Sequence, residues 1–193
     1  WTFRIKRGIH YPDDPAFKGV KRELLARDYA YAFMRVADPA NISPVEATIA
    51  DLGIVGLSER RRQAMEPKTK FDYDTAIEGL EVVDSHTLRI RVKEPRPRLV
   101  ADIALPDVLG AQAREVVEHY GDTIGEHPVG TGPFRLKSWR RSSRIVLERN
   151  PSYREVLYDG QPASDDAEGQ AILAKYKGRR LPLVDEVDIV VVE

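Results

Sequence analysis

Two pairs of neighbouring carboxylates, Asp13-Asp14 and Asp165-Asp166, are the residues best suited to acid–base chemistry. Catalysis by paired carboxylates requires the two groups to converge on one reacting atom. Adjacent side chains in an irregular segment point apart, and both pairs lie in loop-like sequence. The chain also lacks the G-x-S-x-G motif of serine hydrolases and the H-E-x-x-H motif of zinc proteases. The sequence therefore predicts a protein that is not an enzyme and has no catalytic residues.

The histidines do not form a pattern that would hold a metal ion. The four of them are scattered along the chain, at His10, His86, His119 and His127. Glu115 and His119 alone share a helical face at i, i+4 spacing, and two ligands do not complete a metal site. The absence of cysteine excludes disulfides, iron–sulfur clusters and cysteine-based zinc sites. We expect no metal and no cofactor.

Phosphate and nucleic-acid binding also lack support. Gly130-Thr131-Gly132 is not followed by the Lys-Ser/Thr of a P-loop and does not open a helix, so it predicts a structural turn. Two arginine clusters, Arg60–Arg62 and Arg140-Arg141 with Arg144, are balanced by acidic residues elsewhere, and the net charge is −1. A solvated charged face is the expected role of such clusters. We predict no nucleic-acid partner.

The composition is that of a globular domain, with 193 residues, of which 42% are hydrophobic and 32% are charged. No apolar run approaches the roughly 20 residues that cross a bilayer. Apolar residues at helical or alternating spacing predict a mixture of helices and hairpins without a regular βαβ rhythm, which indicates an α+β fold. We expect strands at 1–6, 79–93 (a hairpin), 135–148 (a second hairpin) and 184–192, and helices at 26–36, 58–67, 98–104, 111–120 and 167–176.

One further short helix is expected after Ser43-Pro44, where Ser43 can cap the helix and Pro44 fits its first turn. In the helix at 26–36, Asp28 near the start and Arg35 near the end both suit the helix dipole. Asp38-Pro39 is expected to stop that helix.

The stretch from His127 to Tyr153 is dense in residues with a fixed backbone role. Gly130 and Gly132 are expected to adopt a positive φ or to admit another chain segment closely, and Pro133 imposes an extended geometry before a strand. Asn150-Pro151 lies in a turn that ends the next strand. The residues by themselves predict two tight turns with a hairpin between them.

The glycine–proline segment and the segment that ends at Tyr153 are more specific for one protein family when they occur together. The sequence P-V-G-T-G-P-F, then Trp139, then I-V-L-E-R-N-P-S-Y resembles the signature region of the family 5 extracellular solute-binding proteins. We take Gly130, Thr131, Gly132, Pro133, Asn150 and Pro151 as the structural signature. Further segments resemble family motifs in the expected order, namely Trp1–Gly8, Ala26–Pro39, Val82–Leu88, Lys93–Pro95 and Val187–Ile189.

The resemblance implies a partial periplasmic binding protein-like fold (class II, peptide-binding type). Residues 1–126 would be the small α+β domain specific to the family, and 127–193 part of the first lobe, with a hairpin and a closing strand. The second lobe and a signal peptide are expected to lie outside this sequence. Residues 1–193 alone are therefore expected to bind solute weakly or not at all.

The resemblance also implies a function. It is that of the substrate-binding component of an ABC-type importer, which captures peptide-like or other small solutes in the periplasm, or outside the cell at the membrane. Lobe closure and docking on the permease subunits would follow, with the protein peripheral to the membrane. The alternative is a solute sensor or chaperone-like interaction protein with the same fold.

Two positions depart from the family pattern. Leu25 stands where the family has a capping threonine, so the helix at 26–36 needs a cap from elsewhere. Val45 falls in a segment that approaches the ligand cleft in peptide-binding members. As an aliphatic residue it would offer the ligand less contact than an aromatic one.

Overall fold

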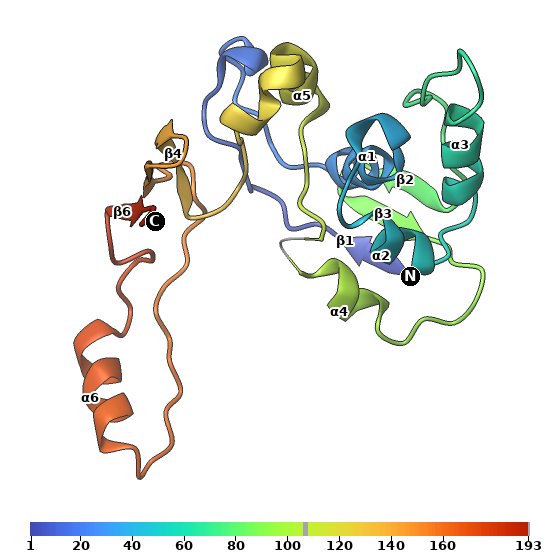
Figure 1. Ribbon diagram of the computed structural model, residues 1–193. Coiled ribbons are helices and arrows are strands. Elements are labelled where there is room, and N and C mark those ends of the chain that lie inside the picture. Colours follow the sequence, from blue (N-terminus) through green and yellow to red (C-terminus); the bar gives the residue numbers. More distant parts are fainter. Residues whose placement is uncertain (106–107, 193) are drawn as a thin grey trace. The chain divides into compact units, whose positions relative to one another are not determined.

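The computed structural model describes residues 1–105 and 108–192. The chain divides into two compact units, the first formed by residues 1–8 and 23–121 and the second by residues 9–22 and 122–193 (Figure 1). This division by contacts falls after residue 121 and assigns 9–22 to the second unit, whereas the sequence prediction placed a single boundary after residue 126. The assignment of 1–126 and 127–193 to the family's small domain and first lobe stays a prediction.

The first unit is a three-stranded antiparallel sheet with helices around it. Its strand order is β1-β3-β2, formed by β1 (Thr2–Arg4), β2 (Leu80–Asp84) and β3 (Thr87–Ile90). The expected hairpin at 79–93 is confirmed, and Val82 pairs with Leu88 across it. The helices are α1 (Ala26–Ala37), η2 (Pro39–Asn41), α2 (Glu46–Asp51), α3 (Leu57–Ala64), α4 (Leu99–Ile103) and α5 (Arg114–Tyr120).

The core of the first unit lies between α1 and the sheet, which α1 covers in Figure 1. Phe33 of α1, Ile90 of β3 and Leu99 of α4 are almost completely buried there. The helical spacing of apolar residues in α1 produces this packing, because it places them on one face of the helix. The expected helix at 26–36 is therefore confirmed with one additional residue.

The start of α1 is capped without the threonine that the family pattern would supply. The Asp28 carboxylate accepts a hydrogen bond from the backbone N–H of Leu25, with Oδ2 and N 2.8 Å apart. Asp28 is itself almost fully buried. A carboxylate in the first turn satisfies the backbone N–H of the N-cap residue and suits the helix dipole. The N–H of Asp28, which a capping threonine would accept from, donates instead to the carbonyl of Leu25 at 3.0 Å.

The second unit contains the other antiparallel sheet, with strand order β4-β5-β6. Its elements are η1 (Pro15–Phe17), η3 (Gly121–Glu126), β4 (Phe134–Arg140), β5 (Arg144–Arg149), α6 (Ala167–Tyr176) and β6 (Glu186–Val190). The expected second hairpin, the helix at 167–176 and the closing strand are confirmed. In the part of the chain that the structure describes, no helix is both long and apolar enough to cross a membrane.

In the first unit, two local predictions are wrong. Ser43 does not cap α2, because that helix begins at Glu46 and its N-cap, Val45, makes no side-chain hydrogen bond. The other concerns Arg60, which does not lie on a solvated face. Its guanidinium donates to the backbone carbonyls of Asp72 and Thr75, and its side chain is only 13% exposed.

Candidate functional site

The signature residues of the second unit are joined by the side chain of Asn150. Its Nδ2 donates to the carbonyl of Gly132 at 2.8 Å, and its Oδ1 accepts from the backbone N–H of Ser152 at 2.9 Å. Its own backbone N–H donates to the carbonyl of Pro133 at 2.9 Å. Asn150 is 2% exposed, so these bonds replace hydration that it loses completely. The asparagine thus fixes the turn after β5 against the segment before β4.

The two glycines of the signature do not have the role that the sequence predicted. Neither Gly130 nor Gly132 is among the described residues with positive φ. A Cβ built at Gly130 would meet nothing within 4 Å, and one at Gly132 would reach only the carbonyl oxygen of Phe134, at 4.0 Å. The prediction failed because glycine permits a left-handed backbone or a close approach but does not require either. Asn150, rather than the glycines, holds this turn.

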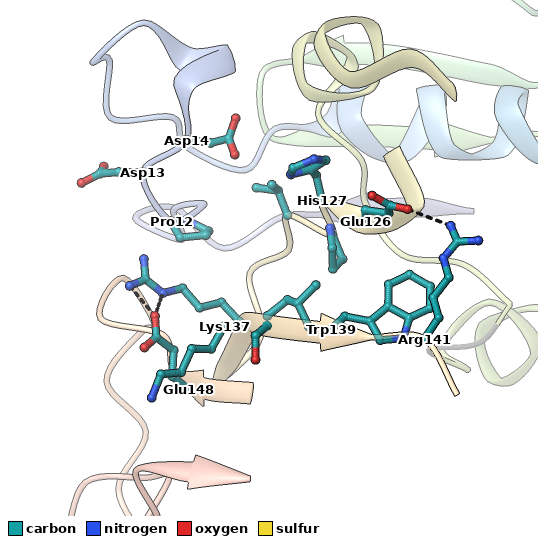
Figure 2. A pocket seen from close by; sticks show the side chains of 14 residues that line it. Pro12, Asp13, Asp14, Glu126, His127, Lys137, Trp139, Arg141 and Glu148 are labelled. Atoms are coloured by element: carbon teal, nitrogen blue, oxygen red, sulfur yellow. Dashed lines mark hydrogen bonds and ion pairs between the residues drawn. The ribbon is translucent and has the colours of Figure 1, made fainter. Parts of the chain in front are cut away.

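A groove of about 570 Å³ lies in the second unit, beside β4 (Figure 2). Trp139, Pro128 and Val129 give it an apolar part, and Trp139 remains 42% exposed. Asp13 and Asp14 line it from the loop before η1, and their carboxylates point in different directions in Figure 2.

The charges along this groove are largely paired within the chain. Arg135 contacts Glu148 at 2.6 Å, and Arg141 contacts Glu126 at 2.7 Å while lying over the ring of Trp139. Lys137 donates to Glu186, and this hydrogen bond raises the pKa of the lysine. An anionic ligand in this groove would therefore compete with carboxylates of the chain for these exposed cations.

One member of each carboxylate pair caps a helix. Asp14 accepts from the backbone N–H of Ala16 at the start of η1, and Asp166 accepts from that of Gly169 at the start of α6. Short polar side chains at a helix start satisfy N–H groups that lack a partner. Within residues 1–105 and 108–192, no three or more histidine, aspartate and glutamate side chains gather as a metal site would need.

Val45 lies at the start of α2, in the first unit. Its side chain is partly exposed, and its carbonyl accepts from the backbone N–H of Ile49. It ends a short segment that runs from Asp38 through η2. Polar side chains of the segment itself, of α3 and of the loop at 72–75 hold it, partly through backbone carbonyls of α1. The sequence analysis did not identify these side chains.

Tyr73 is the centre of that polar set. Its hydroxyl donates to Asp38 Oδ2 at 2.7 Å, and Asn41 Nδ2 approaches the same hydroxyl at 3.3 Å. Asp38 Oδ1 accepts from the backbone N–H of Ala40 and so caps η2. Burial, followed by the hydrogen bond to Asp38, raises the pKa of Tyr73 well above its usual range. The phenol therefore stays a hydrogen-bond donor at all physiological pH values.

Two arginines of α3 also hold the segment from Asp38 to Val45 and the loop that carries Tyr73. Arg60 fixes the loop that carries Tyr73 through its bonds to the carbonyls of Asp72 and Thr75. Arg61 donates to the carbonyl of Ala37 at 3.0 Å and pairs with Glu46 at 3.2 Å. Arg61 thus connects the end of α1 to the first turn of α2.

The loop at 72–75 should make the stability of the protein depend on acid pH. The side chain of Thr75, followed by the backbone N–H groups of Thr75 and Asp74, lowers the pKa of Asp72 from 3.8 to about 2. Because the lowered pKa belongs to the folded state, the stabilisation is complete above about pH 4 and is lost as the pH falls through about 2. Asp72→Asn should reduce the loss of stability over that range, measured by urea unfolding. Asp165→Asn, outside this loop, should leave the pH profile unchanged, and equal profiles for wild type and Asp72→Asn would contradict the prediction.

Comparison with known proteins identifies relatives along the whole chain. The model of the bacterial extracellular solute-binding proteins, family 5 middle, matches residues 1–193. Di/tripeptide-binding protein 2 of Pseudomonas aeruginosa (strain UCBPP-PA14) is 29% identical over 173 residues, which are 86% of this chain and 28% of that protein. The periplasmic oligopeptide-binding protein OppA of Salmonella typhimurium (strain LT2) is 29% identical over 155 residues, which are 79% of this chain and 26% of that protein. The chain thus spans between a quarter and a third of the length of these two relatives.

A solved structure shows the same fold. The crystal structure of a periplasmic oligopeptide-binding protein, OppAIV, from Borrelia burgdorferi superposes with a TM-score of 0.64 at 20% identity. The superposition covers 99% of this chain and 31% of that chain. The predicted α+β fold of the periplasmic binding protein type is thereby confirmed.

Proposed function

Because the chain belongs to family 5 of the bacterial extracellular solute-binding proteins, we propose that it is part of the substrate-binding component of an ABC-type importer. In this role it captures peptide-like solutes in the periplasm, or outside the cell at the membrane, and delivers them to the permease. The observation that carries the proposal is the family match over residues 1–193. Relatives named as di/tripeptide- and oligopeptide-binding proteins support the choice of solute.

Solute capture requires binding and release without chemistry on the ligand. The two carboxylate pairs are consistent with this role, since Asp14 and Asp166 cap helices rather than face a common reacting atom. Val45 is a residue of this chain that we place against the solute. It is partly exposed on a segment that Tyr73, Asn41 and Arg61 hold in one conformation. A prepositioned contact residue improves affinity because less motion is lost on binding.

The direct test is to identify the solute that accompanies the full-length protein in which this sequence occurs. The protein is purified under native conditions and denatured, and the released small molecules are identified by mass spectrometry. We expect short peptides, and calorimetry with the recovered peptides should give dissociation constants of about micromolar or tighter. Recovery of a non-peptide solute that binds with that affinity, together with no binding of the peptides, would contradict the peptide assignment. Residues 1–193 alone are the comparison, and we expect them to bind the same peptides weakly or not at all.

A further inference from the structure

Ile42 adopts a backbone conformation that its side chain disfavours. Its φ and ψ are both 47°, in the left-handed region. The other non-glycine residues with positive φ within the described ranges are Lys18, Lys68 and Ser142, so Ile42 is the β-branched one in this set. Branching at Cβ brings a side-chain atom close to the following carbonyl in this region, and the conformation is a genuine outlier for such a residue. A strained backbone of this kind persists only where the surrounding structure imposes it.

The isoleucine side chain gains almost nothing from the chain in return. It is 87% exposed, the largest exposure of any large hydrophobic side chain among the described residues. An asparagine or glycine would fit the left-handed backbone better and would not expose an apolar group to water. The packing of the described residues therefore gives no reason for isoleucine at this position.

Hydrogen bonds before Ile42 and an ion pair after it hold the segment on both sides. Asp38 caps η2 through Ala40, and the Asp38 carboxylate is fixed by the hydroxyl of Tyr73. Asn41, immediately before Ile42, donates to the carbonyl of Arg35 at 2.8 Å. On the other side, α2 begins at Glu46, which pairs with Arg61. The turn is thus held rigidly while the isoleucine side chain projects from it.

We infer that Ile42 is a solute-contacting residue, which offers an apolar surface to a nonpolar side chain of a peptide-like ligand, and that Tyr73 is the residue that positions it. The inference rests on the proposed function, since Ile42 lies three residues before Val45 on the same short segment. It explains the strain and the exposure together. Rigid presentation of an apolar side chain favours binding, because the ordering of the turn is completed during folding.

The test uses the full-length protein and two probe peptides, trileucine and trilysine, titrated by calorimetry. Ile42→Asn retains a residue that tolerates the left-handed backbone but removes the apolar group. We expect this variant to bind trileucine about fivefold more weakly and trilysine within about twofold of wild type. Its urea unfolding midpoint should equal or exceed that of wild type, because the backbone strain is relieved and no packing is lost. Lys68→Asn is the matched control, at another left-handed position, and should change neither affinity.

Tyr73→Phe tests the positioning role without removing Ile42. Loss of the hydroxyl should speed amide hydrogen exchange at residues 40–46 in the absence of peptide and weaken trileucine binding about threefold. Phenylalanine keeps the aromatic packing, so exchange in β3 should stay unchanged.

The outcomes separate the inference from the proposed function. If wild type binds trileucine and Ile42→Asn binds it equally well, Ile42 does not contact the solute, and the proposed function stands. A lowered unfolding midpoint for Ile42→Asn would show that the side chain packs within the chain, and would overturn the inference as well. If wild type binds neither these probes nor the peptides recovered from cells, the peptide-binding function itself fails. If amide hydrogen exchange at residues 40–46 is unchanged in Tyr73→Phe, Tyr73 does not position Ile42, and the contact between Ile42 and the solute is unaffected by that result.

Discussion

Replacing Gly79 with alanine is expected to lower the free energy of unfolding by about 3 kcal/mol or more, one of the two largest effects we expect of any single substitution in this chain. A Cβ at Gly79 would lie 2.5 Å from the carbonyl oxygen of Val55 and 2.6 Å from its nitrogen. Both are backbone atoms, which cannot rotate away as a side chain could. The backbone around Gly79 is also tied into the sheet, since its N–H donates to Val55 at 2.8 Å and its carbonyl accepts from Arg91 at 3.0 Å. The clash therefore has to separate two bonded segments.

Gly130→Ala is the matched control for this prediction. Nothing lies within 4 Å of a Cβ at Gly130, and its backbone is not left-handed. The change should alter the free energy of unfolding by less than about 0.5 kcal/mol. Guanidinium unfolding followed by tryptophan fluorescence can distinguish the two units in variants that retain a single tryptophan, because Trp1 belongs to the first unit and Trp139 to the second. A larger loss from Gly130→Ala than from Gly79→Ala would contradict the account of both glycines.

Asn150→Ala is expected to destabilise the second unit by about 2–4 kcal/mol. The substitution removes the donor to the Gly132 carbonyl and the acceptor for the Ser152 N–H, and it leaves a space where a fully buried side chain stood. Buried polar groups that lose their partners keep the cost of desolvation without compensation, and this is the reason for the large effect. Trp139 fluorescence during unfolding measures it. A loss below about 1 kcal/mol would mean that water replaces the asparagine.

Asn150→Asp tests the hydrogen bond that Asn150 donates to Gly132 separately from the one that it accepts from Ser152. The variant keeps an oxygen for Ser152 but at neutral pH presents a carboxylate to the Gly132 carbonyl in place of an N–H donor. Burial and this repulsion should raise the pKa of the new carboxyl, because both disfavour the charged form. Stability relative to wild type should therefore rise as the pH falls below about 5, where the protonated carboxyl can donate. A difference between the two proteins that is constant with pH would show that the donor to Gly132 is not what stabilises the turn.

The two glycine substitutions also show where sequence reasoning succeeded and where it failed. Gly130 and Gly132 stand in a dense motif of glycine and proline, and the pattern favoured them as special positions. Gly79 has no such context in the sequence, because the reason for it is the backbone of Val55, 24 positions earlier in the chain. A close approach between segments distant in sequence leaves no local signal.

The candidate site shows the same difference between local patterns, which the sequence reveals, and contacts between distant segments, which it does not. The spacing of apolar residues predicted α1, both hairpins and α6, since periodicity is a local property that the fold keeps. The family motifs led to Val45, but no motif or spacing pointed to Tyr73, and Arg60 was predicted to lie in a solvated cluster. Tyr73 meets Asp38 across 35 positions, and Arg60 reaches the carbonyls of the loop that carries Tyr73. No spacing rule covers such contacts.

The sequence by itself determined the elements of the signature stretch, His127–Tyr153, and through them the family. Extended segments, turns and a hairpin follow from residue types and alternation, which act over a few positions. The tertiary structure alone decided that Asn150, and not the glycines, holds this stretch together, and that Ile42 is held exposed in a strained turn. Both outcomes depend on where a distant donor or acceptor comes to lie once the core has formed. Burial of the core fixes those positions, and hydrogen bonds then select the residues that hold each turn.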